Sequence, residues 1–245
     1  MNIVLSIGGF DPTAGAGVLR DVLTFRKIGV YGFAVITAVT FQNLSGFYGF
    51  HALRGEDVKR QIENVMEENK IRYVKVSMVG NGEISRILEE KIREYGWYVV
   101  FDPLLYAKNG YPLNRMEDIE RIMKISNVIV PNVPEAEILS GMKMENSEDV
   151  VRAGWKIREK YGAKVIIKGG HLEGEDYLFG EKLVRMKMKH LGKIVHGTGC
   201  VYSSALLGYL AHGYSLEKAF KRAREFLQGE IEKSLKLGGE YEVLP

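Results

Sequence analysis

The sequence predicts an α/β protein with an open, mostly parallel, doubly wound sheet, in one domain over residues 1–245. Short apolar runs rich in β-branched residues alternate with amphipathic segments of helical period, which is the pattern of parallel strands joined by right-handed crossovers. We count six such strand–helix units, whereas a (β/α)₈ barrel needs eight. The chain then continues with a hairpin pattern and two successive helices, so an open sheet is favoured over a barrel.

The individual elements follow from periodicity, turn residues and caps. Apolar, β-branched runs predict strands over residues 3–7, 33–39, 73–78, 98–102, 128–131 and 164–168. Amphipathic periods predict helices over 14–28, 56–69, 83–95, 115–125, 147–161, 199–212 and 216–235, with a short helix near 135–139. Thr13 is expected to cap the first helix. Residues 177–179 and 183–188 predict an antiparallel hairpin, and the aromatic, glycine-rich segment 41–53 predicts an extra strand or flap.

The bulk composition excludes several classes of function. The hydrophobic share of 46% and the charged share of 27% are those of an ordinary globular protein. The net charge is +3 and the charges alternate in sign, which argues against nucleic acid as a partner. No apolar run approaches the roughly 20 residues of a membrane span, and the N-terminus lacks the pattern of a signal peptide. The single cysteine, Cys200, allows no internal disulfide, and we expect the protein in the cytoplasm.

The turn from His196 to Cys200 is the segment most indicative of function. It reads His-Gly-Thr-Gly-Cys and directly precedes a predicted helix. Gly197 and Gly199 allow backbone dihedrals that point several N–H groups at one spot, and the positive end of the helix dipole adds to them. Such a turn binds an anion, most often phosphate. The alternative, from spacing alone, is an ordinary glycine-rich helix start with a buried cysteine.

Two better-known phosphate motifs are absent from the sequence. Gly192-Lys193 is followed by Ile194 and lacks the upstream glycine of a G-x-x-x-x-G-K-[ST] loop. The segment 15–20 lacks the third glycine of the dinucleotide fingerprint and does not directly follow a strand. A Walker-type ATPase and a standard NAD enzyme are therefore disfavoured.

Three features near the first two strands are candidates for ligand binding. The glycine-rich segment 8–17 follows a strand, at the sheet edge where ligands approach the backbone. Asp21 lies on the apolar face of the next helix, so its carboxylate points toward the sheet; the alternative is an Asp at the edge of that face that reaches water or pairs with a neighbour. Gln42 follows the second strand, and its amide could pair with the donor and acceptor of a heterocycle. An ordinary polar turn is the alternative for Gln42.

Polar side chains also follow the later strands. Asp102 ends one strand, and Asn132 and Glu135 follow the next and start a helix. Carboxylates at such strand ends are suited to hold magnesium through water, whereas helix capping and pairing with the helix dipole are the alternatives for Asn132 and Glu135. Lys168 ends another strand and places a cation on the same edge. Met78 could wall a flat ring there or belong to the core.

Together these segments resemble the hydroxymethylpyrimidine (phosphomethylpyrimidine) kinases of thiamine biosynthesis, within the ribokinase-like superfamily. The resemblance covers nearly the whole chain and rests on GGFDPTAGAGVLRDVLTF at 8–25, TAVTFQN at 37–43, DPLLYAKNG at 102–110, PNVPEAE at 131–137, KGGH at 168–171 and HGTGC at 196–200. A cysteine ends the last motif, where sugar kinases carry aspartate. The resemblance implies a three-layer α/β/α fold with a small flap or hairpin. It also implies ATP-dependent phosphorylation of 4-amino-5-hydroxymethyl-2-methylpyrimidine and then of its monophosphate.

The resemblance further implies roles for residues that match the motifs. Gln42 would read the pyrimidine edge, with Gly9, Asp21 and Met78 framing the ring. The nucleotide would be bound by Asn132, Lys168, Gly170 and Thr198, and Mg²⁺ by Asp102 and Glu135. The anion hole would consist of Gly197, Thr198 and Gly199, with Cys200 in the catalytic position. Related kinases are often dimers, so a homodimer is one option, for which the aromatic segment 41–51 could serve as interface or lid.

Some residues depart from the family pattern. Ile194-Val195 stand where an Asn-Thr pair usually precedes HGTGC, the segment between His171 and His196 is short, and Leu104-Leu105 and Val79-Gly80 differ from the commonest residues near the substrate. The alternatives are therefore a pyridoxal or pyridoxine kinase, a sugar or nucleoside kinase, and a non-catalytic protein that senses a pyrimidine. For the kinase, we hypothesise that the helix N-terminus lowers the pKa of the Cys200 thiol and that its thiolate accepts the hydroxyl proton in the first step.

Overall fold

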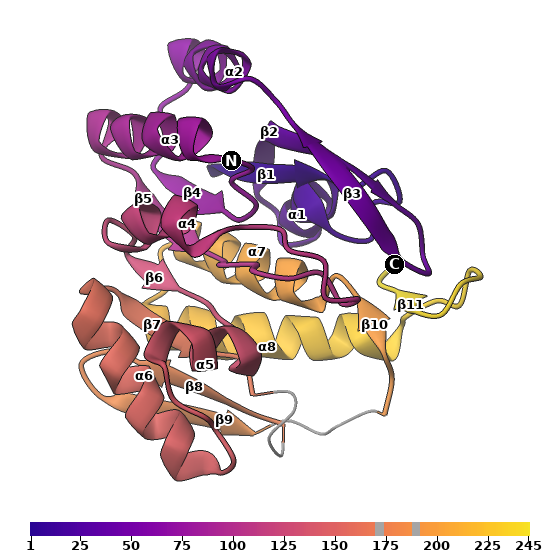
Figure 1. The fold of residues 1–245 in the computed structure, drawn as a ribbon, viewed down its shortest axis with the longest axis vertical. Coiled ribbons are helices and arrows are strands. Elements are labelled where there is room, and N and C mark those ends of the chain that lie inside the picture. Colours follow the sequence, from indigo (N-terminus) through magenta and orange to yellow (C-terminus); the bar gives the residue numbers. More distant parts are fainter. Residues whose placement is uncertain (170–173, 188–191) are drawn as a thin grey trace.

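A nine-stranded sheet forms the centre of the computed structural model, which describes residues 1–169, 174–187 and 192–245 (Figure 1). Its strands are β1 (Ile3–Phe10), β2 (Tyr31–Gln42), β3 (Phe47–Ala52), β4 (Tyr73–Val76), β5 (Tyr98–Phe101), β6 (Val128–Ile129), β7 (Lys164–Ile167), β8 (Glu175–Phe179) and β9 (Leu183–Lys187). They lie in the order β3-β2-β1-β4-β5-β6-β7-β8-β9. The six strands from β2 to β7 in this order are parallel, whereas β3, β8 and β9 pair in antiparallel fashion. The predicted open sheet is confirmed, with β3 as its flap and β8–β9 as its hairpin.

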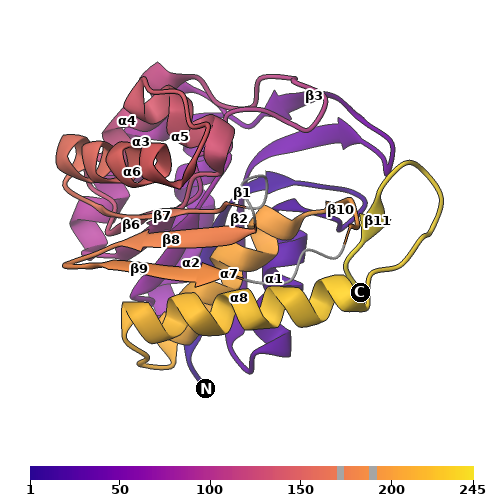
Figure 2. The ribbon, with the colours of Figure 1, turned by 90° about the horizontal axis from the view of Figure 1, so that it is seen from below.

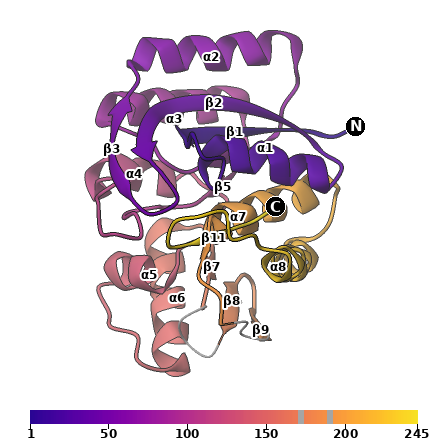
Figure 3. The same ribbon diagram turned by 90° about the vertical axis from the view of Figure 1, so that its right-hand side faces the viewer.

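Helices cover both faces of the sheet and give the predicted three layers. They are α1 (Gly17–Lys27), α2 (Gly55–Glu68), α3 (Gly82–Tyr95), α4 (Met116–Met123), α5 (Val133–Ser140), α6 (Ser147–Tyr161), α7 (Thr198–Ala211) and α8 (Leu216–Glu232). Helices α1, α7 and α8 pack on one face and α2 to α6 on the other (Figure 3). Among the helices of the described ranges, none is both long enough and apolar enough to cross a membrane.

Apart from β2, the parallel strands are buried on both faces, and their side chains alternate between two apolar clusters. On β1, Val4 belongs to the cluster under α1, α7 and α8, whereas Leu5 and Ile7 belong to the cluster under α2 to α6. On β4, Val74 and Val76 face the second cluster. Lys75, between them, therefore points toward the α7 side, because successive side chains of a strand point to opposite faces.

Two expectations about local structure were wrong. The first helix begins at Gly17, not at residue 14, and Thr13 does not cap it, because its hydroxyl donates to Asp11 Oδ1 at 2.8 Å. A second small sheet, β10 (Val195–His196) with β11 (Glu242–Val243), was not predicted. Strands of two residues show no period that a sequence pattern could reveal. Figure 2 shows β10 and β11 near the C-terminal end of α8, at the edge where the site lies.

The strand order places a reversal point at β1. The chain moves from β1 to its neighbour β2 on one side and later returns to β4 on the other side. In doubly wound folds the loops diverge at such a point and leave a crevice outside the carboxyl ends of the strands. The loop after β1 and the segment after β4 flank this crevice.

Candidate active site

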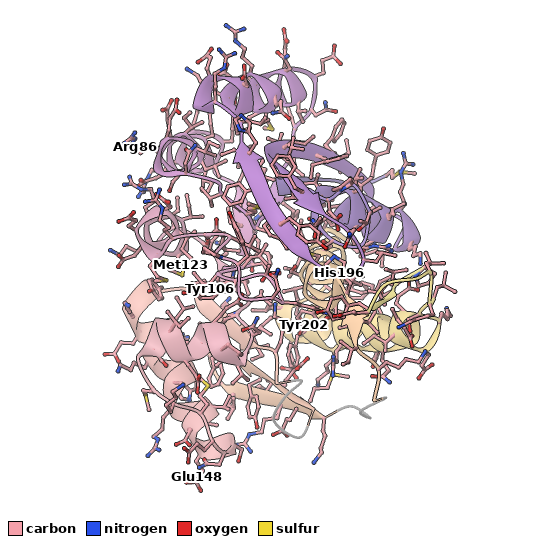
Figure 4. The ribbon with its side chains drawn as sticks, turned by 45° about the vertical axis from the view of Figure 1, so that its right-hand side comes forward. Arg86, Tyr106, Met123, Glu148, His196 and Tyr202 are labelled. Atoms are coloured by element: carbon pink, nitrogen blue, oxygen red, sulfur yellow. The ribbon has the colours of Figure 1, made fainter. Side chains whose placement is uncertain are left out.

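A cavity of about 950 Å³ opens along the carboxyl ends of the parallel strands. Most of the predicted site residues line it together: Gly9, Gln42, Met78, Asp102, Asn132, Glu135, Lys168, Gly197, Thr198, Gly199 and Cys200. Figure 4 marks this region with Tyr106, with His196 just before α7 and with Tyr202 within α7. Asp21 is not among the lining residues, and Gly170 lies outside the described residues.

The turn before α7 packs backbone against backbone with the loop after β1. Gly197 has φ +80°, and a Cβ there would lie 1.8 Å from the carbonyl oxygen of Gly15. Gly17 has φ +64°, and its Cβ would lie 2.3 Å from the carbonyl oxygen of Gly9. Only glycine fits at both positions, because a side chain at Gly197 would push the two loops apart and one at Gly17 would collide with the backbone at the end of β1. The backbone N–H of Gly17 also bonds the Cys200 thiol. The predicted anion-binding turn is thus built from two segments about 180 residues apart in the sequence.

Asp11 and His196 join these two segments, and the sequence reasoning missed this pair. The Asp11 carboxylate accepts hydrogen bonds from the backbone N–H groups of Thr13 and Ala16, each at 2.8 Å, and its Oδ2 lies 3.3 Å from His196 Nε2. Burial alone would raise the pKa of Asp11, but its bonds with His196, Thr13 and Ala16 bring that pKa below the ordinary value. Both residues lie in recognised motifs, yet nothing in their spacing shows that they meet.

A lysine and a carboxylate lie beside the anion turn. Lys168 Nζ is 3.2 Å from Asp102 Oδ1, and the Ser203 hydroxyl donates to Asp102 Oδ2 at 3.0 Å. A Cβ on Gly199 would be 3.4 Å from Lys168 Nζ, so the cation directly adjoins the turn. Burial opposes the charge of Lys168, but Asp102 and Glu135 raise its pKa above the ordinary value. A charged lysine next to free backbone N–H groups favours a phosphate there.

Asn132 and Glu135 form a capping box at the start of α5. The Asn132 side chain accepts from the Glu135 N–H at 2.9 Å, and Glu135 Oε2 accepts from the Asn132 N–H at 2.9 Å. The structure thus contains the helix cap that was the alternative role for Asn132. Both residues also line the cavity. Burial, with the nearby Asp102 charge, raises the pKa of Glu135 to about 7, although Lys168 opposes the shift. A further cation nearby would stabilise the ionised form of this buried carboxyl group.

The described residues offer few side chains that could bind a metal ion. These residues contain no cluster of three or more His, Cys, Asp or Glu side chains that could hold a metal ion. Asp102 and Glu135 are two buried carboxyl groups close enough to affect each other's charge. Mg²⁺ is commonly bound by one or two carboxylates together with substrate phosphates, so this pair fits magnesium that arrives with a nucleotide.

Asp21 lies beneath the cavity, in a buried polar cluster. Its carboxylate is 2.5 Å from Lys75 Nζ and accepts hydrogen bonds from the hydroxyls of Ser6 (2.5 Å) and Ser204 (2.7 Å). Both members of the ion pair are fully buried. Lys75 Nζ also lies 3.4 Å from the Cys200 carbonyl oxygen. The alternative for Asp21, pairing with a neighbour, is thus what the structure contains. Lys75 was missed, although a lysine inside an apolar strand is a signal of a buried partner.

The cavity is also lined by a glutamine amide and a thioether. Gln42, the last residue of β2, donates from Nε2 to Thr40 Oγ1 at 2.7 Å, and the Thr40 hydroxyl donates to the Phe10 carbonyl at 2.8 Å. These bonds fix the amide, whose oxygen is available to a ligand. Met78 is buried against Gly9, where a Cβ would lie 2.8 Å from its sulfur. Both Met78 and Gln42 line the cavity.

The thiol of Cys200 is more basic than the hypothesis required. Burial raises the pKa of Cys200 to about 11; the charge of Lys75 opposes this shift without reversing it. The expected lowering by the helix N-terminus is therefore wrong, because the loss of hydration at a buried thiol is the larger effect. At neutral pH the resting group is a thiol.

The fold and the site together are those of an α/β enzyme that transfers phosphate. The phosphomethylpyrimidine kinase family model matches residues 11–244, so the chain belongs to this family. The predicted family and enzyme class, a phosphotransferase, are confirmed.

Individual relatives agree with this assignment. A hydroxymethylpyrimidine/phosphomethylpyrimidine kinase of Aquifex aeolicus is 41% identical over 99% of each chain. The crystal structure of a phosphomethylpyrimidine kinase from Clostridium difficile 630 superposes with a TM-score of 0.82, at 36% identity, over 94% of this chain and 100% of that one. A pyridoxal kinase from Staphylococcus aureus, solved with AMP-PCP and pyridoxal, has a TM-score of 0.88 at 28% identity, over 100% and 93% of the two chains.

Proposed function

We propose that this chain transfers the γ-phosphoryl group of ATP to hydroxymethylpyrimidine and then to phosphomethylpyrimidine. The observation that carries the proposal is one cavity lined both by the fixed Gln42 amide and by the anion turn at 197–200. The names of the relatives point to the same two acceptors. The test is a coupled ADP-release assay over a panel of pyrimidine and pyridine alcohols. Turnover of pyridoxine in preference to the pyrimidines, or tight binding without turnover, would overturn the proposal.

The Gln42 amide is proposed to read the pyrimidine edge, with Met78 and Gly9 against the ring. We expect Gln42→Met to raise KM for hydroxymethylpyrimidine by about 10- to 100-fold, because the 4-amino group or a ring nitrogen then loses its hydrogen-bond partner. The change in kcat should be small, since the amide is proposed to bind the ring and not the phosphates. Steady-state kinetics measure this, with Gln61→Met as a matched control, because Gln61 bonds the Ile36 backbone outside the cavity. Equal KM values for the wild type and Gln42→Met would refute the role of Gln42.

The phosphate groups are proposed to lie against Gly197, Thr198 and Gly199, with Lys168 beside them. Phosphoryl transfer passes through a loose transition state, so positioning and charge neutralisation account for most of the catalysis. Asp102 and Glu135 would hold Mg²⁺, which when bound neutralises developing phosphate charge. Asp102 also fixes Lys168 through their 3.2 Å contact, and Ser203 fixes Asp102. Asn132 holds the start of α5 and with it the Glu135 carboxyl group.

Cys200 is proposed to accept the hydroxyl proton of the alcohol in the first step. Only a small fraction of the thiol is ionised, but the thiolate is a strong base. We expect Cys200→Ala to lower kcat for the alcohol by about 10²-fold or more, the usual contribution of a general base. The second acceptor is an anionic phosphate and needs no base, so its kcat should fall much less. A larger loss in the second step, or equal loss in both, would show that Cys200 acts by shape.

The pH dependence of the first step gives a separate test. A group with a pKa of about 11 is mostly protonated between pH 7 and 9, so the thiolate fraction rises with pH over that range. If the thiolate is the base, kcat for the alcohol rises with pH by about tenfold per unit at most. Cys200→Asp, which has an ionised carboxylate throughout that range, should show a flat profile. A flat wild-type profile, with the chemical step shown to limit the rate, would contradict the role of the thiolate.

We also infer that residues 1–245 act as one kinase domain, because helices on both faces share the same nine-stranded sheet.

A homodimer is our proposal for the assembly, supported by the exposed aromatic rings of Phe41 and Tyr48 at the flap. Sedimentation equilibrium measures the mass of the particle. We propose that this ATP-consuming reaction takes place in the cytoplasm. We propose neither nucleic acid nor a membrane as a partner.

A further inference from the structure

Lys108 differs from the other basic side chains of the cavity in its lack of an acidic partner. In the described part of the chain, the lysines and arginines that line the cavity are Lys108, Lys168, Lys193 and Arg224. Three of them form ion pairs: Lys168 with Asp102, Lys193 with Glu242, and Arg224 with Asp176. No ion pair of the described residues includes Lys108. Lys108 is exposed overall, but partial desolvation of its ammonium group without a counter-charge lowers its pKa to about 8.

The contacts of Lys108 leave part of its ammonium group free. Its Nζ donates to the carbonyl oxygen of Val195 at 2.9 Å and lies 4.2 Å from the ring centroid of Tyr241. An ammonium group has three N–H donors, and the Val195 carbonyl takes one. A cation that lines the cavity without an acidic partner can form a charge-assisted bond with an anion that enters there. The place of Lys108 therefore suits a negatively charged ligand group.

The loop that carries Lys108 contacts both the segment before the anion turn and the flap residue that pairs with Gln42. Val195, which Lys108 contacts, directly precedes His196 and the turn. Asn109, the neighbour of Lys108, donates to the Phe47 carbonyl at 2.7 Å, which ties the loop after β5 to the flap β3. The nucleotide phosphates already have Lys168 and the backbone N–H groups of the turn. A second cation on the acceptor side fits an acceptor that itself carries a phosphate.

We propose that Lys108 binds the phosphate of phosphomethylpyrimidine and so supports the second phosphorylation selectively. This inference rests on the proposed function. The first acceptor is a neutral alcohol and gains no ionic contact from Lys108. The second acceptor brings about −1.5 to −2 charges toward the phosphates of ATP, and a nearby ammonium group offsets their repulsion. In that step an acceptor phosphate oxygen bonds the γ-phosphorus, the bond from the γ-phosphorus to the β,γ-bridging oxygen breaks, and ADP leaves. Lys108 transfers no proton.

The test compares both acceptors in wild type, Lys108→Met, Lys108→Arg and the control Lys182→Met, whose lysine is exposed at the β8–β9 turn. Lys108→Met should raise KM for phosphomethylpyrimidine by about 10- to 100-fold, the range for one lost charge-assisted hydrogen bond. Its kcat/KM for hydroxymethylpyrimidine should change by less than about threefold, which also shows that the variant is folded. Lys108→Arg should recover part of the loss. Calorimetric titration with phosphomethylpyrimidine, without nucleotide, should show the same weakening in Kd.

The outcomes separate this inference from the function on which it rests. An equal loss with both acceptors would overturn the inference, because Lys108 would then only tie the loop to β10. An unchanged KM for phosphomethylpyrimidine, or a wild type that phosphorylates the alcohol alone, would also overturn it while leaving the kinase assignment intact. A wild type without turnover of either acceptor would overturn the proposed function itself, and the inference with it.

Discussion

Lys75→Met is expected to lower the free energy of unfolding by about 3–5 kcal/mol. Asp21 and Lys75 are both fully buried and only 2.5 Å apart, so removal of the lysine leaves a buried carboxylate without its counter-charge. Ser6 and Ser204 still donate to that carboxylate, but hydroxyl groups do not neutralise it. Denaturant unfolding followed by circular dichroism measures the change.

Two further variants show whether the missing counter-charge is the cause. The double variant Asp21→Asn with Lys75→Met removes both charges and should recover much of the lost stability, because no unpaired ion remains. Arg60→Met breaks the exposed pair with Glu56 and should cost at most about 1 kcal/mol. A Lys75→Met midpoint close to that of Arg60→Met would show that the buried pair contributes little.

Gly197→Ala is expected to lower kcat/KM by about 10²- to 10³-fold, comparable to the loss of an oxyanion-hole donor. The added Cβ would lie 1.8 Å from the Gly15 carbonyl, at a φ of +80° that L-residues rarely adopt. The turn must then move away from the loop after β1, and the backbone N–H groups that we assign to the phosphate move with it. Steady-state kinetics with hydroxymethylpyrimidine measure this loss.

Gly213→Ala is the matched control for Gly197→Ala. Gly213 has a similar φ of +85°, but a Cβ there meets no atom within 4 Å. The control therefore has the cost of the left-handed backbone, about 1 kcal/mol of stability, without the clash. Kinetics of Gly213→Ala close to wild type, beside a large loss in Gly197→Ala, would identify loop displacement as the cause. Similar kinetics in both variants would contradict a catalytic role of the turn.

The departures from the sequence predictions have physical reasons. Thr13 looks like a helix cap by its position, but the buried Asp11 carboxylate binds its hydroxyl and its N–H. The Cys200 pKa depends on burial, which a helix start in a sequence does not reveal, and burial outweighs the dipole. Asp21 was correctly expected to face the sheet, yet the sequence did not show that Lys75 would meet it there beneath the cavity.

The order of the main elements and the glycine turn before α7 were determined by the sequence alone. Periodicity and glycines are local properties, and they predicted the strands, the helices, the flap, the hairpin and the turn that ends at Cys200. Only the tertiary structure decided which distant side chains meet. The contacts between Asp11 and His196, between Asp21 and Lys75, and between Lys108 and Val195 join residues far apart in the chain. Such contacts depend on how the sheet is wound and on which charges it buries, and neither leaves a local pattern in the sequence.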